Sequence, residues 1–180
     1  MARILAIDGG YRDGGITAQA LDEAAAAARE AGAEVSVVRL REKRIEFCTN
    51  CRACTQAPGE RRGDCPLSDE MAALLDQAEA ADGFILASPV NYYNVTALTR
   101  RFLERLTCYG YWPWGAPAPK LRILKPSRRA VLITSSAMPS LLGRLATGAL
   151  RALDCAASML GAKTLGTLFI GLSSAERPAL

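Results

Sequence analysis

Short apolar runs alternate along the chain with longer segments in which apolar residues recur at helical spacing. The short runs predict strands at 3–8, 34–40, 83–88, 129–134 and 163–171. The amphipathic segments predict helices at 14–32, 69–81, 95–107 and 140–161, the second of them capped by Ser68. The run GFILAS at 83–88 is suited to a central strand that is buried on both faces.

This alternation is typical of an α/β protein in which helices cover both faces of a parallel sheet. No shift in composition marks a linker, and half of the residues are hydrophobic, so residues 1–180 are expected to form one domain around one core. Ligands of such sheets bind beyond the carboxyl ends of the strands. The loops that follow the strands are therefore the candidate site.

Three of these loops carry candidate chemistry: DGGYRDGGIT (8–17), SPVNYYNVT (88–96) and TSSAMPS (134–140). The glycines of the first let backbone amides approach a phosphate at a helix N-terminus, where the helix dipole favours an anion. The other two offer amides, hydroxyls and aromatic groups that suit a planar heterocycle. The first loop matches neither the GxGxxG nor the GxxxxGK[ST] fingerprint.

Charge and composition exclude several classes of function. The net charge is +4 and basic residues are interspersed with acidic ones, so no nucleic-acid partner is expected. The absence of histidine excludes a Ser-His-Asp triad, a Cys-His nucleophile and an imidazole-ligated metal. The sequence shows no secretory signal and no uninterrupted apolar span, so we expect a cytoplasmic protein without membrane contact.

Two of the loops resemble motifs of the flavodoxin-like NADPH-dependent FMN reductase family. GGYRDGGIT (9–17) is similar to the family pattern GSPRxGGNT, and SPVNYYNVTALTRRFLER (88–105) to SPVYxGxVSAxLKxFxDR. The matching residues are Gly9, Arg12, Gly14, Gly15, Thr17, Ser88, Pro89, Val90, Val95, Ala97, Phe102 and Arg105. The resemblance extends over nearly the whole chain and, within the family, is to the iron-sulfur flavoproteins.

The resemblance implies a three-layer flavodoxin-like sandwich with strand order 2-1-3-4-5, one bound FMN, and NAD(P)H as electron donor. The acceptor would be a quinone, a free flavin or a similar planar molecule. Because the flavin itself accepts the hydride, no catalytic side chain is assigned. The expected FMN-binding residues are Gly10, Arg12, Ile16, Thr17, Ser88, Pro89, Val90, Asn91, Tyr92, Tyr93, Thr134, Ser135 and Ser136.

The chain also departs from the family pattern. Gly10 replaces the usual Ser and Ile16 the usual Asn, so phosphate binding would depend more on backbone amides, Arg12 and Thr17. Asn91 stands where the family usually has Tyr, so the wall of the flavin pocket would differ. The sequence stops where the fold normally adds a closing helix. One face of the last strand would then lack cover, so we expect a homodimer or homotetramer.

Four of the six cysteines, Cys48, Cys51, Cys54 and Cys65, lie in a cysteine-rich loop at 47–66. The C-x2-C-x2-C triplet is typical of [4Fe-4S] ligation, and Pro66 follows the fourth cysteine as in bacterial ferredoxins, although the ten-residue gap before it is long. Free thiols, structural zinc and a redox disulfide remain alternatives. Cys108 and Cys155 are expected to be buried thiols in helices.

Residues 108–120 form an excursion rich in aromatic residues and proline. Its tryptophans would either cover the core or a subunit interface, or place Trp112 or Trp114 as a lid over the flavin. The basic clusters at 41–44 and 127–129 would be solvated, unless one binds the 2'-phosphate of NADPH. Two other functions stay open: an electron-transfer protein that serves a redox partner, and a noncatalytic zinc-binding or regulatory protein.

Overall fold

A computed structural model of the chain describes residues 1–123 and 125–174. Its centre is a five-stranded parallel sheet in the order β2-β1-β3-β8-β9. The strands are β1 (Arg3–Asp8), β2 (Glu34–Arg39), β3 (Gly83–Ala87), β8 (Arg128–Ser135) and β9 (Ala162–Ile170). Counted along the chain these five strands have the order 2-1-3-4-5, so the predicted flavodoxin-like sheet is confirmed.

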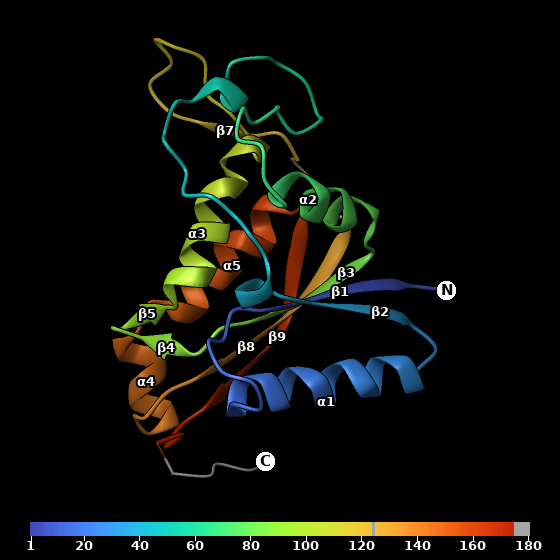
Figure 1. The fold of residues 1–180 in the computed structure, drawn as a ribbon, viewed down its shortest axis with the longest axis vertical. Coiled ribbons are helices and arrows are strands. Elements are labelled where there is room, and N and C mark those ends of the chain that lie inside the picture. Colours follow the sequence, from blue (N-terminus) through green and yellow to red (C-terminus); the bar gives the residue numbers. More distant parts are fainter. Residues whose placement is uncertain (124, 175–180) are drawn as a thin grey trace.

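Helices cover the two faces of the sheet (Figure 1). They are α1 (Ile16–Glu30) on one face, and α2 (Met71–Ala80), α3 (Ala97–Arg105) and α5 (Ala149–Met159) on the other. Because side chains alternate along a strand, Leu5 and Leu86 join the larger core with α2, α3 and α5, whereas Ala6 and Ile85 pack with Leu21 of α1.

The sheet face that carries α1 is incompletely covered along its β8–β9 edge. Val131 of β8 is 37% exposed, and Leu165 and Leu168 of β9 are 67% and 45% exposed. The expected lack of a closing helix concerns the C-terminal end, and residues 175–180 lie outside the described part of the chain. Because these leucines are exposed, a subunit contact at this edge stays a prediction.

The prediction of one continuous helix over 140–161 is wrong. The chain forms α4 (Ser140–Ala146) and α5, with Thr147 in an extended conformation between them. At this break the Gly148 amide donates to the Tyr93 carbonyl at 2.8 Å, and a Cβ on Gly148 would lie 2.9 Å from the Asn94 side chain. The hairpin after β3 therefore lies close to this break, and a side chain at position 148 would require the Asn94 side chain to shift.

The predicted Ser68 cap is also wrong, because α2 begins at Met71 and its capping position is Glu70. The Asp69 side chain accepts the Met71 amide at 3.0 Å. None of the helices in the described ranges is long and apolar enough to cross a membrane.

The remaining elements are short. Two hairpins form from β4 (Val90–Asn91) with β5 (Asn94–Val95), and from β6 (Gly110–Tyr111) with β7 (Lys120–Leu121). The 3-10 turns are η1 (Leu40–Glu42), η2 (Ala53–Thr55) and η3 (Leu106–Tyr109). Figure 1 shows the cysteine loop and the β6–β7 excursion together beyond the C-terminal end of α3, whereas β4 and β5 lie at the other end of that helix. The fold thus separates the cysteine loop from the loops of the candidate flavin site.

Candidate functional site

A cavity of about 620 Å³ opens at the carboxyl ends of β1, β3 and β8. This is the edge of the sheet at which the sequence predicts ligand binding. The lining residues are Gly10, Tyr11, Arg12, Gly15, Ile16, Thr17, Ala18, Pro89, Val90, Asn91, Thr96, Ser135, Ser136, Ala137, Ser173 and Ser174. All three predicted loops therefore contribute to one cavity.

Most of the predicted FMN-binding residues line this cavity, and four do not. Ser88 and Thr134 are fully buried and are not among the residues of the cavity wall. Tyr92 and Tyr93 form the turn of the β4–β5 hairpin with φ of 47° and 63°, and they are 95% and 60% exposed. Two consecutive left-handed residues form one of the favoured turns of a two-residue hairpin, and these tyrosines therefore lie at its tip.

The N-terminus of α1 forms part of the cavity wall, and among the described residues its capping position, Gly15, has no side chain that caps the first turn. This turn holds no acidic residue, and Ile16, Thr17 and Ala18 line the cavity. Uncapped amides at a helix N-terminus form a favourable site for an anion. The Thr17 hydroxyl lies 2.7 Å from the Ser135 hydroxyl and so joins the first loop to the third.

A buried hydroxyl network joins the first loop to the second. Thr96 caps α3, and its hydroxyl donates to the Gly9 carbonyl at 2.6 Å and lies 2.9 Å from the Thr99 hydroxyl, which donates to Ser88 at 3.0 Å. A Cβ on Gly9 would clash with Thr99, which explains the glycine. Thr96 and Thr99 organise the site but are not among the residues predicted from the sequence, although a threonine in front of a helix is a recognisable capping signal.

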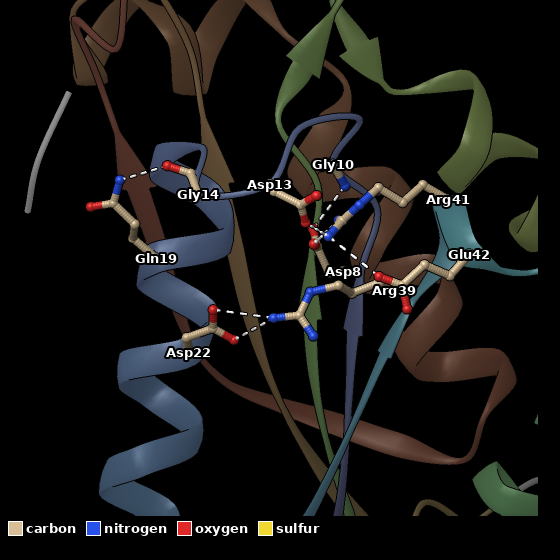
Figure 2. A network of polar contacts seen from close by, with 9 residues as sticks. All are labelled: Asp8, Gly10, Asp13, Gly14, Gln19, Asp22, Arg39, Arg41 and Glu42. Atoms are coloured by element: carbon tan, nitrogen blue, oxygen red, sulfur yellow. Dashed lines mark hydrogen bonds and ion pairs between the residues drawn. The ribbon is translucent and has the colours of Figure 1, made fainter. Parts of the chain in front are cut away.

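An ion-pair network supports the first loop from behind (Figure 2). Asp8, only 1% exposed, accepts from Arg41 at 2.9 Å, and the same guanidinium also contacts Asp13 and lies 3.5 Å from Glu42. The Arg41 side chain is therefore largely buried, whereas the sequence predicts a solvated basic cluster at 41–44. Asp8 indicates this partner in the sequence, because an aspartate at the end of a buried strand requires a positively charged or hydrogen-bonding partner.

Three cysteines of the loop at 47–66, Cys48, Cys51 and Cys65, lie within electrostatic range of the fourth, Cys54. Burial raises the pKa of the Cys54 thiol, and Cys65, Cys48 and Cys51 raise it further. Cys51 is exposed, and a hydrogen bond from the Ala53 amide lowers the pKa of its thiol. None of the four lines the cavity formed by the described residues.

As a donor set, four neighbouring thiols suit an iron-sulfur cluster or zinc. In the described residues, however, no group of three or more cysteine, aspartate or glutamate side chains stands close enough to hold a metal ion. All four thiols are free. The loop thus supplies thiol ligands of the type that a cluster or zinc needs, but the described residues are not arranged in a coordination geometry.

A buried ion pair closes the base of the cysteine loop. Arg105 at the end of α3 donates to Asp69 at 3.2 Å, and their side chains are 3% and 0% exposed. Asp69 also accepts the Glu46 amide at 2.7 Å, while Arg105 donates to the Glu46 carbonyl at 2.9 Å. Burial alone would raise the pKa of Asp69, but the bonds from Arg105 and the two amides hold it below its usual value.

The cysteine loop also packs against the aromatic excursion. The Arg52 guanidinium lies between the rings of Trp112 and Trp114, 3.9 Å and 4.2 Å from their centroids, and donates to the Trp112 carbonyl at 2.7 Å. Arg122 donates to four carbonyl groups, including those of Cys54 and Cys108. Both tryptophans therefore cover the cysteine loop, and neither lines the cavity.

The two remaining cysteines differ in exposure. Cys108 in η3 is buried as predicted, and burial raises the pKa of its thiol to about 12. The predicted burial of Cys155 is wrong, because this residue of α5 is exposed. Its neighbours Ala156 and Ala157 face the core, so the helix turns Cys155 away from the sheet.

Fold and cavity together define a flavodoxin-like α/β protein in which the N-terminus of α1 lies beside an open pocket. The model of the family "NADPH-dependent FMN reductase" matches residues 2–169. The chain belongs to this family, as the two loop motifs predict.

Curated relatives include two archaeal proteins named iron-sulfur flavoprotein. That of Archaeoglobus fulgidus is 36% identical over 111 residues, which are 62% of this chain and 48% of the relative. That of Methanocaldococcus jannaschii is 31% identical over 103 residues, 57% of this chain and 51% of the relative. The chain thus spans about half the length of the curated relatives it matches.

Solved structures show the same fold. An NAD(P)H:quinone oxidoreductase from Methanothermobacter marburgensis has a TM-score of 0.67 at 16% identity, with 95% of this chain and 87% of the other covered. An FMN-dependent NADH-azoreductase from Bacillus anthracis, in complex with FMN, has a TM-score of 0.70 at 12% identity, with 97% and 89% covered. At these identities the likeness concerns the fold alone.

Proposed function

We propose that the chain is an FMN-dependent NAD(P)H oxidoreductase that reduces a quinone, a free flavin or a similar planar acceptor. The observation that carries this proposal is the cavity at the carboxyl ends of the parallel strands, which meets the uncapped N-terminus of α1. Family membership supports FMN as the cofactor and NADPH as the donor. FMN would supply hydride transfer at its ring, which needs no acidic or basic side chain.

The residues of this chain would bind and orient the flavin. The amides at the start of α1, with Arg12 and Thr17, would hold its phosphate. Pro89, Val90 and Asn91 from one side and Ser135 and Ser136 from another would flank the ring system. The buried bonds between Thr96, Thr99, Ser88 and the Gly9 carbonyl would fix the first two loops relative to each other.

The cysteine loop supports a second candidate function, an iron-sulfur flavoprotein that exchanges electrons with a redox protein. In this proposal Cys48, Cys51, Cys54 and Cys65 would hold a [4Fe-4S] cluster, which supplies one-electron chemistry. Its support is that Cys48, Cys51 and Cys65 lie within electrostatic range of Cys54, in a loop anchored by Arg105, Arg122 and Arg52. The names of the curated relatives agree with it.

Two measurements test these functions on protein purified without oxygen. The visible spectrum with iron and sulfide analysis reports flavin and cluster together, and steady NADPH oxidation with a quinone reports turnover. Bound FMN with steady turnover supports the oxidoreductase, whereas FMN with iron and no NADPH oxidation supports the electron-transfer protein. A chain that binds no flavin would contradict both.

A further inference from the structure

A buried carboxylate lies directly behind the loop that we assign to the flavin phosphate. Asp8 ends β1, is 1% exposed, and accepts the Gly10 amide at 2.8 Å. Gly10 itself lines the cavity, and Asp13 follows the cavity residue Arg12 in the same loop. The loop proposed to bind an anion thus carries two negative charges of its own.

Arg41 pairs with both carboxylates. It belongs to η1, just after β2, the strand that pairs with β1, so its side chain reaches the loop from the neighbouring strand. Its Nη1 donates to Asp8 at 2.9 Å and its Nη2 contacts Asp13, as Figure 2 shows. The Arg41 side chain is 13% exposed, so solvent screens these interactions only in part.

The charge of Arg41 decides how this loop responds to a phosphate. A phosphate monoester carries about −1.5 to −2 charges at pH 7. Without a cation, the carboxylates of Asp8 and Asp13 would repel that charge, and the repulsion would be strong because Asp8 is removed from water. With the cation in place, Arg41 offsets one of the two negative charges, and solvent screens much of the other because the Asp13 side chain is 86% exposed. Arg12 and the amides of α1 then face a weaker opposing charge at the cavity.

We infer that Arg41 is a positioning residue that compensates Asp8 and Asp13, and that it makes the site select FMN over riboflavin. This inference rests on the proposed function, because it takes the cavity to be the flavin site. It assigns Arg41 a role through the loop and not through contact with the ligand, since Arg41 is not among the described residues that line the cavity.

The test compares flavins with and without a phosphate. Dissociation constants for FMN and riboflavin are measured from flavin fluorescence for the unaltered chain and for Arg41→Gln at low salt. We expect FMN to bind about tenfold more weakly to the variant, while riboflavin binding changes less than about twofold. The FMN penalty should shrink as salt is raised, because ions screen the uncompensated carboxylates.

Two further variants separate charge from shape. Asp8→Asn combined with Arg41→Gln removes the buried charge but keeps an oxygen for the Gly10 amide, so FMN affinity should return to within about threefold of the unaltered chain. Arg41→Lys keeps the charge and should also retain FMN affinity. The double variant remains informative if Arg41→Gln alone fails to fold around an unpaired Asp8.

The outcomes are distinct. Equal losses of FMN and riboflavin affinity, an unchanged FMN affinity in Arg41→Gln, or a double variant that stays about tenfold weaker would each overturn the compensating role. An unaltered chain that binds riboflavin as well as FMN would overturn the selectivity. If the unaltered chain binds neither flavin, the proposed function fails, and the inference fails with it.

Discussion

Arg12 in the first loop can bind a phosphate by its charge, and Thr17 at the start of α1 can bind it by its hydroxyl. Both line the cavity, and the Thr17 hydroxyl already lies 2.7 Å from Ser135. We expect the double substitution Arg12→Ala and Thr17→Ala to weaken FMN binding about 100-fold, because it removes a charge-assisted bond and a hydroxyl contact. Flavin titration measures this loss.

A matched control replaces Arg151 and Thr164 with alanine, since neither is among the described residues of the cavity wall. Its FMN affinity should remain that of the unaltered chain. If the Arg12 and Thr17 double variant also retains full affinity, the phosphate does not bind at the N-terminus of α1.

At the residue scale, Asp69 also links stability to pH. Its pKa lies below the ordinary value in the folded chain, so its stabilising contribution is complete above the unfolded value of about 3.9 and is lost as pH falls through the folded value. Asp69→Asn leaves Arg105 buried without a carboxylate and should lower the free energy of unfolding by about 3–5 kcal/mol at neutral pH. Denaturant unfolding from pH 7 down to pH 3 measures both effects.

The difference between the unaltered chain and Asp69→Asn should be constant above about pH 5 and shrink below about pH 4. Glu70→Gln is the matched control, because this partly exposed neighbour pairs with Lys43 at the surface, and glutamine keeps an oxygen for the Arg44 amide that Glu70 accepts at 2.7 Å, so the change should cost less than about 1 kcal/mol. A difference that grows on acidification would contradict the pairing.

At the scale of elements, the cysteine loop is anchored by Arg105, Arg122 and Arg52. This anchoring bears on whether the gap before Cys65 is too long for all four cysteines to bind one cluster. The ten-residue gap before Cys65 adds closure entropy, but that cost grows only with the logarithm of loop length. Arg122 donates to the carbonyls of Gly59 and Ala57 inside the gap, so part of it is already ordered. A long gap is therefore compatible with ligation by all four cysteines.

If the loop binds a [4Fe-4S] cluster, Cys51→Ser should remove the broad absorption near about 400 nm and most of the bound iron, while FMN binding persists. Cys155→Ser is the control, because that thiol lies on α5 and should leave iron content unchanged. Equal iron in both variants, or none in the anaerobically prepared unaltered chain, would leave the cysteines as plain thiols.

Tryptophan fluorescence gives an independent measurement of cluster binding by the cysteine loop. The only two tryptophans of the chain both stack on Arg52, which lies between Cys51 and Cys54. Their emission should therefore change when the loop binds iron and sulfide, and this change should be absent in Cys51→Ser.

At the scale of the whole molecule, the exposed β8–β9 edge predicts self-association. Leu165 and Leu168 of β9 are exposed apolar side chains, and so are Leu141, Leu142 and Leu145 of α4, the helix that follows β8 and contacts β9. We expect a homodimer or homotetramer at micromolar concentration, and Leu165→Glu with Leu168→Glu should shift it to the monomer. Sedimentation velocity measures the shift.

Lys163→Glu tests whether any added negative charge on β9 has the same effect, and it should leave the assembly intact. A monomer in the unaltered chain would contradict the assembly, and an unaffected assembly in the leucine variant would place the contact elsewhere.

By itself, the sequence determined the elements and the chemical class of the site. Apolar runs and helical spacing are local signals, because each reports which face of one element is buried. They gave the five main strands within a few residues and located the three loops that line the cavity. The motifs in those loops, read as a family resemblance, gave the strand order and the family.

Only the tertiary structure decided which side chains meet. Asp8 and Arg41 are 33 positions apart and Asp69 and Arg105 are 36 apart, so no local pattern pairs them. The same holds for Arg52 between the two tryptophans and for the break at Gly148, which depends on the hairpin packed against it. Ser88 and Thr134 lie in the predicted loops but are buried outside the cavity wall, because side-chain direction depends on how strands and helices pack together.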